Sequence, residues 1–167
     1  MLLGLDGNIY LAGTNSWTII RKFGDAPESA IAKFDVEAEA FDPDYCQSIP
    51  ALTHGQEAGT VIAYTPGEFV VRAVDESLAD IGSVDSYYTD IEHACRFYQG
   101  TIDEDGELSL EEQPALGTAP HYCWGWVYKV DGSPYFWGED TMYKWNGTEM
   151  VPTFKAAGNA STFQRIR

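Results

Sequence analysis

Five turn signals, each a residue followed by glycine, divide the chain into short runs of β-prone residues. Such pairs allow the positive φ angles that tight hairpin turns need, and between β-prone runs they are the strongest short-range signal of a hairpin. The five pairs are Asp6-Gly7, Pro66-Gly67, Asp105-Gly106, Asp131-Gly132 and Asn146-Gly147. We therefore expect a mainly β protein, made of antiparallel hairpins in a sandwich, a partial barrel or a propeller-like arrangement.

Alternation of apolar and polar residues predicts how two of the strands are buried. In KFDVEAEAF (33–41), apolar residues fall on one face and three carboxylates on the other, which predicts a half-buried strand with an acidic outer face. In EFVVRAV (68–74), Phe69 and Val71 share one face while Val70 lies on the other. This second strand is expected to be covered on both faces.

Two segments are predicted to be short helices. Asp25-Ala-Pro-Glu28 has an N-capping aspartate, an early proline and a glutamate three residues after the cap, and it leads toward Ile31 and Phe34. In Asp85–Tyr98, apolar residues recur at helical spacing after a capping residue. The same segment also alternates from Ile91 to Phe97 as a strand does, so helix and strand both stay open.

The length of 167 residues fits one domain that can bury a core without disulfides or metals. We expect residues 1–154 to form a single β-rich domain and residues 155–167 to form a polar C-terminal tail. The tail carries Lys155, Arg165 and Arg167 and no carboxylate. It is either a frayed terminus, which is the more common case, or an arm that docks on a neighbouring subunit.

The net charge of −16 results from 10 Lys and Arg against 26 Asp and Glu. This balance argues against binding to nucleic acid or to an anionic membrane, because both need clusters of basic side chains. A basic protein surface or a cation complements such a charge, although the charge also serves solubility by itself. The N-terminus lacks a basic region followed by a long apolar run, so we predict no signal peptide and expect synthesis in the cytoplasm.

A weak internal repeat relates the two ends of the chain. Leu5–Ser16 and Val130–Thr141 share Asp-Gly, a tyrosine three residues later and a glycine three residues beyond it. The pattern predicts that the two ends form similar, neighbouring units of one sheet system.

The sequence aromatic-x-Trp-Asn-Gly-Thr at Tyr143–Thr148 follows an Asp-Gly hairpin. It resembles the short β-hairpin repeats of propeller-like proteins and of structural proteins in tailed-bacteriophage virions. The resemblance covers the two end segments and leaves the middle, from about Gly24 to Thr118, unmatched. It implies a structural role in a virion that is assembled in the host cytoplasm. It also implies turns at Gly7, Gly132 and Gly147 and packing aromatic residues at Tyr10, Tyr135 and Trp145. A closed propeller is not expected, because at roughly 40 residues per blade the chain barely reaches four blades.

The C-terminal third is rich in aromatic residues. In YCWGWVYKV (122–130), four rings alternate, so one face of a single strand would carry them all. Such a row stacks on glycans, forms a subunit interface or fills a sandwich core, and the core is the most frequent of these roles. The residues that we associate with an interface or a glycan site are Tyr122, Trp124, Trp126, Tyr128, Trp137 and Trp145.

Two His-x-Cys pairs, His93-Ala-Cys95 and His121-Tyr-Cys123, are the sharpest candidates for a metal site. Residues two apart point to the same face of a strand, so two adjacent strands would present four zinc ligands. This requires Asp85–Tyr98 to be a strand, and buried cysteines more often act as small apolar residues. Asp103–Glu112 lacks the glycine spacing of an EF-hand and is predicted to be a hairpin tip. We therefore expect no cofactor.

No nucleophile elbow and no glycine-rich phosphate loop is present in the sequence, and this disfavours an enzyme. We expect a non-enzymatic structural or assembly subunit, similar to tail, neck or decoration proteins of bacteriophage virions. Its partners would be other protein subunits, in a homo-oligomer or a larger assembly. One alternative is a carbohydrate-binding module that uses Trp124, Trp126 and Trp137. Another is a small acidic inhibitor or immunity protein that covers a basic active site.

Overall fold

The computed structural model of the chain describes residues 1–13, 28–74, 95–114, 127–130, 133–138 and 141–155. Within these ranges the protein is mainly β, as predicted, with one short α-helix. The strands are β1 (Leu2–Leu3), β2 (Ile9–Gly13), β3 (Ala30–Asp35), β4 (Ala40–Ser48), β5 (Glu57–Thr65), β6 (Glu68–Val74), β7 (Cys95–Ile102), β8 (Leu108–Glu112), β9 (Val127–Val130), β10 (Ser133–Gly138), β11 (Thr141–Trp145) and β12 (Met150–Lys155). The helix is α2 (Ile49–Leu52).

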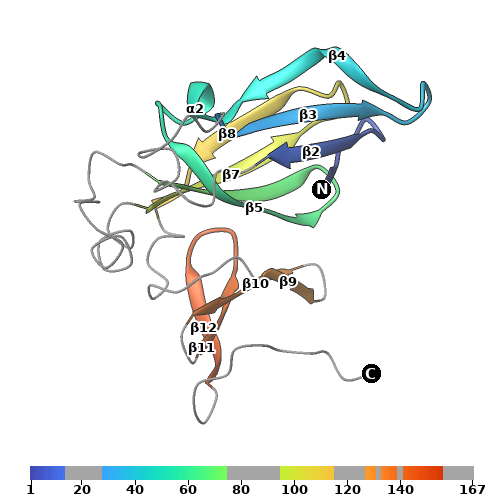
Figure 1. The fold of residues 1–167 in the computed structure, drawn as a ribbon. Coiled ribbons are helices and arrows are strands. Elements are labelled where there is room, and N and C mark those ends of the chain that lie inside the picture. Colours follow the sequence, from blue (N-terminus) through green and yellow to red (C-terminus); the bar gives the residue numbers. More distant parts are fainter. Residues whose placement is uncertain (14–27, 75–94, 115–126, 131–132, 139–140, 156–167) are drawn as a thin grey trace.

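The strands form three antiparallel sheets of four strands, each in simple up-and-down order (Figure 1). Sheet A contains β1 to β4, sheet B contains β5 to β8, and sheet C contains β9 to β12. Four of the five residue-glycine pairs lie within described turns between strands that pair as hairpins, which confirms those turns. Asp131-Gly132 lies outside the described residues, but β9 and β10, the strands before and after it, also pair as a hairpin. Gly67, Gly106 and Gly147 adopt φ angles of 73°, 79° and 94°, in the left-handed region that favours glycine.

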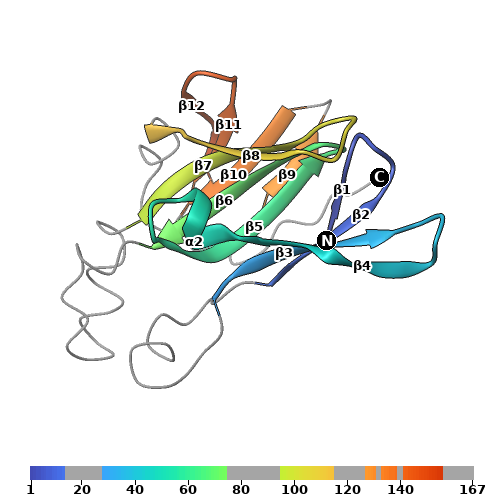
Figure 2. The same ribbon diagram turned by 90° about the horizontal axis from the view of Figure 1, so that it is seen from above.

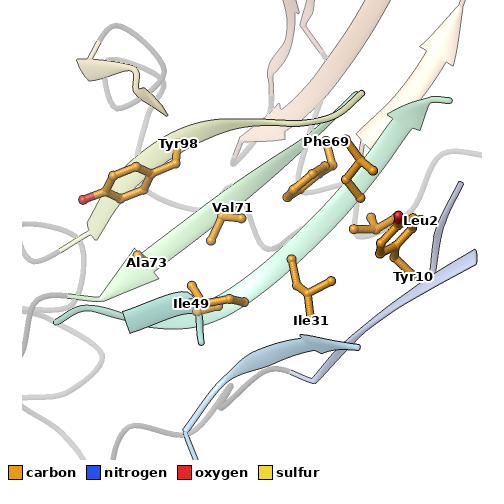
Figure 3. Close-up of a cluster of buried hydrophobic side chains, with 10 residues drawn as sticks. Leu2, Tyr10, Ile31, Ile49, Phe69, Val71, Ala73 and Tyr98 are labelled. Carbon is orange, nitrogen blue, oxygen red and sulfur yellow. The ribbon is translucent and has the colours of Figure 1, made fainter. Parts of the chain in front are cut away.

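Sheets A and B enclose the main core of the protein. Side chains from both sheets point into the space between them, as the close-up in Figure 3 shows. Tyr10 and Ile31 come from sheet A, Phe69 and Val71 from sheet B, and Ile49 from α2. None of the five is more than 1% exposed, so the two sheets form a sandwich.

Sheet C packs against the other face of sheet B. Along β6, Phe69 and Val71 face sheet A, whereas Val70 joins Phe136 and Trp145 in a second cluster. Successive residues of a strand point to opposite faces, so β6 is buried on both sides, as its apolar sequence predicts. The protein therefore consists of three layers, with sheet B in the middle. The described strands form no closed barrel, and their sheets are stacked as layers rather than arranged as propeller blades.

The prediction of one continuous strand across KFDVEAEAF is wrong. The chain turns between Val36 and Glu39, so this sequence contains the end of β3, a turn and the start of β4. Asp35 closes the turn, because its Oδ1 accepts hydrogen bonds of 2.9 Å from the backbone N–H groups of Glu37 and Ala38. Asp and Glu on alternate positions are compatible with a turn as well as with a strand face.

The structure describes only part of the two segments for which a helix was predicted. Cys95 through Tyr98 belong to β7, so the C-terminal part of Asp85–Tyr98 is a strand; the rest of that segment lies outside the described residues. Asp25, Ala26 and Pro27, which begin the first predicted helix, lie outside the described residues. Ile31 and Phe34, which follow that segment, lie in β3.

The one described helix, α2, joins β4 to β5, as Figure 2 shows. Its start follows standard capping chemistry: the side chain of Ser48 accepts a hydrogen bond from the N–H of Ala51, and Pro50 occupies the first turn. The helix places Ile49 in the main core.

The two ends of the chain are not neighbours in one sheet. Leu5–Gly13 belongs to sheet A, whereas the matching β9 and β10 belong to sheet C on the far side of sheet B. The second half of the repeat also differs in its burial. Tyr10 is fully buried, but Phe136 rather than Tyr135 enters the core of the second hairpin. The expectation that the two similar sequences form neighbouring units of one sheet system is therefore wrong.

Candidate functional site

The structure describes only part of the predicted aromatic surface. Tyr122, Trp124 and Trp126 lie outside the described residues. Tyr128 is in β9, opposite Tyr135 in the pairing register.

The sequence also associates two further tryptophans with an interface or a glycan site. Trp137 is in β10, opposite Met142 of β11. Trp145 is 7% exposed and packs with Val70 and Phe136 against the middle sheet of its own chain. Its indole therefore stabilises the layered fold.

Of the four zinc candidates, the structure describes only Cys95, the first residue of β7. His93, His121 and Cys123 lie outside the described residues. Within the described ranges, no three His, Cys, Asp or Glu side chains come together as a metal site. Asp103–Glu112 forms the predicted hairpin tip, where Asp103 Oδ1 accepts hydrogen bonds of 2.9 Å from the N–H groups of Asp105 and Glu107.

A row of apolar side chains crosses the outer face of sheet A. The pairing register places Leu3 opposite Ile9, Ile9 opposite Phe34, and Phe34 opposite Phe41, so the row spans all four strands. We call these four residues the apolar row. Leu3 is 46% exposed and Phe41 is 54% exposed. The rings of Phe34 and Phe41 meet edge to face, with centroids 5.4 Å apart, a favourable geometry for an aromatic pair.

The apolar row continues into a hollow beside the short edge strand β1. This hollow has a volume of about 390 Å³ and is lined by Met1, Leu3, Ile9, Tyr64 and Pro66, among others. Most of its wall is apolar, and its size is sufficient for a large side chain from another molecule. Leu11, which is 40% exposed, extends the same outer face on β2.

Carboxylates surround one end of the apolar row. The ten residues from Asp35 to Asp44 contain five carboxylates and no lysine or arginine. We call these five side chains the acidic rim: Asp35, Glu37, Glu39, Asp42 and Asp44. They lie at the end of β3, on the β3–β4 turn and in the first half of β4, close in sequence to Phe41. The outer face of sheet A is thus apolar in the centre and negative at one side.

Sheet C has an exposed face of a different character. Tyr135, Lys144 and Val151 lie opposite one another across β10, β11 and β12, and Phe154 lies opposite Met142 in the next row. We call these five residues the sheet C face. Val151 is 36% exposed and Phe154 is 52% exposed, and Lys144 Nζ lies 6.0 Å from the centroid of the Tyr135 ring. This face is apolar and carries a positive charge.

A buried carboxylate links sheet A to the tip of sheet B. Asp6, whose side chain is 8% exposed, accepts hydrogen bonds from the N–H of Asn8 at 3.1 Å and from the hydroxyl of Tyr10 at 2.8 Å. Lys33 Nζ lies 3.4 Å from the same carboxylate. The β7–β8 turn packs beside it, because a side chain added at Gly106 would lie 2.9 Å from both Asp6 and Tyr10. We call this arrangement the Asp6 cluster.

The electrostatics of the Asp6 cluster indicate a structural role. Burial raises the pKa of Asp6, but the hydrogen bonds from Asn8, Tyr10 and Lys33 outweigh it, so the pKa of Asp6 lies below its usual 3.8. Burial, together with the hydrogen bond to Asp6, raises the pKa of Tyr10. Both groups therefore keep one protonation state across the physiological range, and the cluster stabilises the β1–β2 turn on the core side of sheet A.

A polar cleft lies between sheets B and C. It has a volume of about 500 Å³, and its lining includes Tyr64, Glu68, Gln99, Gln113 and Trp145. The side-chain amide of Gln99 donates a hydrogen bond to the hydroxyl of Tyr64, which fixes both groups at the wall. Lys144 also lines the cleft. Aromatic rings beside amides and charged groups are a lining that suits a polar, hydroxyl-rich ligand.

The apolar row was not predicted from the sequence, although a signal was present. In β2, Ile9 and Leu11 alternate with Tyr10 and Ala12, so both faces of the strand are apolar.

Comparison with protein-family models and with curated proteins finds no match for this chain. No helix in the described ranges is long and apolar enough to span a membrane.

Proposed function

We propose that the protein is a non-enzymatic structural or assembly subunit that associates with further copies of itself through the apolar row. The observation that carries the proposal is the row itself, which crosses all four strands of sheet A and leaves Leu3 and Phe41 about half exposed. Exposed apolar side chains that are contiguous across a sheet mark interaction surfaces far more often than scattered ones do.

The energetics favour burial of this surface in a contact. Removing apolar area from water is a favourable term in protein association. The aromatic pair Phe34 and Phe41 supplies large side chains of the kind that dominate binding energy in protein interfaces. The adjoining hollow of about 390 Å³ offers a place for an anchoring side chain of the partner.

A resemblance in the sequence favours one type of assembly. The hairpin at Tyr143–Thr148 resembles hairpin repeats of structural proteins in tailed-bacteriophage virions, and this supports a tail, neck or decoration subunit. Three antiparallel sheets stacked as layers suit a part that is repeated in an assembly. The acidic inhibitor remains the alternative for the same surface, with a basic enzyme as the partner.

The test is the native mass of the purified chain, measured by light scattering over a wide range of concentration. The wild type should form particles heavier than 18.5 kDa, and Phe41→Asp should return the chain to 18.5 kDa. Val36→Asp is the matched control, because Val36 is 46% exposed and lies on the β3–β4 turn outside the row. A wild type that stays at 18.5 kDa at every concentration would refute self-association through this face.

A second candidate function, glycan binding, rests on the cleft between sheets B and C. Its wall combines the rings of Tyr64 and Trp145 with the amides of Gln99 and Gln113. Titration with neutral oligosaccharides, followed by NMR of the side-chain amides, should shift the Gln113 signals, and Gln113→Ala should weaken binding about fivefold. Gln47→Ala, an exposed amide on sheet A, is the control. Unchanged spectra across cello-, malto-, xylo- and chito-oligosaccharides would remove this candidate.

A further inference from the structure

The loop between β11 and β12 is the one described turn in which glycine follows an amide side chain, in Asn146-Gly147. Residues 146–149 are exposed and link Trp145 to Met150, which pair across the hairpin (Figure 1). A Cβ added at Gly147 would meet no atom within 4 Å. The Asn146-Gly147 peptide is therefore accessible to water.

The backbone N–H of Gly147 differs from those of the other turn glycines. Gly7, Gly67 and Gly106 each donate their N–H to a backbone carbonyl, at 3.3, 2.6 and 3.1 Å. No such bond from Gly147 is found in the part of the chain that the structure describes. Because no hydrogen bond has to be broken, its nitrogen can move toward the side chain that precedes it.

The side chain of Asn146 is held with its carbonyl group polarised. Its Oδ1 accepts hydrogen bonds of 2.9 Å from the backbone N–H groups of Thr148 and Glu149. Two donors at this distance stabilise the negative charge that develops on a carbonyl oxygen when a nucleophile adds to its carbon. The next nitrogen along the chain, that of Gly147, is the nucleophile that closes a five-membered ring with this carbon.

We propose that Asn146 is a site of spontaneous deamidation in the folded protein. The nitrogen of Gly147 forms a bond to Asn146 Cγ, its proton passes to the departing amide nitrogen, and the C–N bond of the carboxamide breaks with release of ammonia. Water then opens the resulting succinimide at either carbonyl and leaves aspartate or isoaspartate at position 146. The reaction consumes only water, and it is independent of the self-association proposed above.

Asn8, the other asparagine among the described residues, is held in a different way. Its Nδ2 donates a 2.8 Å hydrogen bond to the carboxylate of Asp6, and its Oδ1 accepts one of 3.1 Å from the N–H of Val36. The residue that follows it is Ile9, whose stiff β-branched side chain crowds the backbone nitrogen. Asn8 is therefore expected to keep its amide and serves as an internal control.

Deamidation at this position changes the polar cleft between sheets B and C. Asn146 lines that cleft, and the charges of Glu68 and Lys144 balance each other among its described lining residues. A carboxylate at position 146 gives the wall a net negative charge. Isoaspartate also inserts a methylene into the main chain next to Trp145, which packs against Val70 of sheet B. The modification thus acts on the cleft and on the packing of sheet C together.

The test is incubation of the folded chain at mildly alkaline pH in water enriched in heavy oxygen, followed by mass spectrometry of its peptides. The peptide that contains Asn146 should lose its amide, gain a heavy oxygen and separate into two isomers, while the peptide that contains Asn8 stays unchanged. Because exposed loops open at almost no cost, the loss should be no more than about threefold slower than in the urea-unfolded chain. A far slower loss in the folded protein, or an equal loss at Asn8, would overturn the proposal.

Two variants identify the reacting groups, and circular dichroism should show that both stay folded. Asn146→Gln keeps an amide but has to close a six-membered ring, which forms far more slowly, so this loop should no longer take up heavy oxygen. Gly147→Ala adds a methyl group beside the attacking nitrogen without meeting a neighbour, and it should slow the loss severalfold. If Gly147→Ala reacts as fast as the wild type and gives no isoaspartate, water attacks the amide directly and the proposed route is wrong.

Discussion

The hydroxyl of Tyr10 donates a 2.8 Å hydrogen bond to the carboxylate of Asp6, and this bond lies between the two sheets of the main sandwich. Tyr10 is fully buried, so its hydroxyl depends on Asp6 for an acceptor. Lys33 completes the arrangement with Nζ at 3.4 Å from the same carboxylate. The polar groups of Asp6, Tyr10 and Lys33 are therefore paired with one another on the core side of sheet A.

Replacing Asp6 should destabilise the fold strongly. Asp6→Ala leaves the buried hydroxyl of Tyr10 and the ammonium of Lys33 without their acceptor, and we expect a loss of about 3 kcal/mol in the free energy of unfolding. Urea denaturation at neutral pH measures this loss. Glu37→Ala removes an exposed carboxylate of the β3–β4 turn and should change the free energy of unfolding by less than about 0.5 kcal/mol. Equal effects of the two substitutions would contradict the role of the cluster.

The same carboxylate predicts a specific dependence of stability on pH. The pKa of Asp6 is lowered in the folded protein, so its stabilising contribution is present above the usual value of 3.8 and is lost as the pH falls through the folded-state pKa. The difference in unfolding free energy between the wild type and Asp6→Ala should therefore be constant from about pH 7 to about pH 5 and shrink below about pH 4. A difference that grows on acidification would have the opposite sign and would refute the assignment.

Gly106 should tolerate no side chain. Its φ angle is 79°, and an added Cβ would lie 2.9 Å from the Asp6 carboxylate and from the Tyr10 hydroxyl. Gly106→Ala therefore combines backbone strain with a clash, and we expect a loss of about 2–4 kcal/mol in stability. Gly147 also has a positive φ, 94°, but an added Cβ there meets no atom within 4 Å. Gly147→Ala should cost only about 1 kcal/mol, and the gap between the two unfolding midpoints measures the clash.

Trp145 should act as a core residue of the monomer. Trp145→Ala removes a large side chain from the cluster with Val70 and Phe136, so we expect a loss of about 3–5 kcal/mol, independent of protein concentration. Hydrogen exchange should show faster opening of β10 and β11 in this variant, because the packing of sheet C on sheet B is weakened. Val151→Ala, on the exposed face of the same sheet, serves as the control. A loss for Trp145→Ala that disappeared on dilution would instead place the indole in a subunit contact.

The turn between β3 and β4 offers a stabilising substitution. Glu39 has a φ of 53°, a conformation that costs an ordinary residue about 1 kcal/mol and glycine almost nothing. Glu39→Gly should therefore raise the unfolding free energy by about 0.5 kcal/mol, after the entropy of the more flexible glycine is included. Glu37→Gly, at a position without positive φ in the same turn, should lower it. Thermal unfolding monitored by circular dichroism distinguishes the two directions.

The turns of this protein could be predicted from its sequence, because their chemistry is local. A glycine after Asp, Asn or Pro supplies the backbone conformation of a hairpin wherever the flanking residues favour strands, and all five such sites lie between paired strands. The double burial of β6 was also predictable, since apolar residues on both faces of a strand require cover on both sides.

The β3–β4 turn was not predictable in the same way. Its left-handed position is occupied by Glu39 instead of glycine, and the alternating carboxylates around it match the period of a strand. The helix α2 was missed as well, although Ser48 and Pro50 form a capping signal, because four residues are too few to show a helical period.

The sequence by itself determined that this chain is built from antiparallel hairpins, because each hairpin depends on a few adjacent residues. Only the tertiary structure decided which hairpins share a sheet, which faces are buried, and that the similar ends of the chain lie on opposite sides of sheet B. A row such as Leu3, Ile9, Phe34 and Phe41 joins residues far apart in sequence through strand pairing. Its exposure depends on how the sheets stack, which no local pattern specifies.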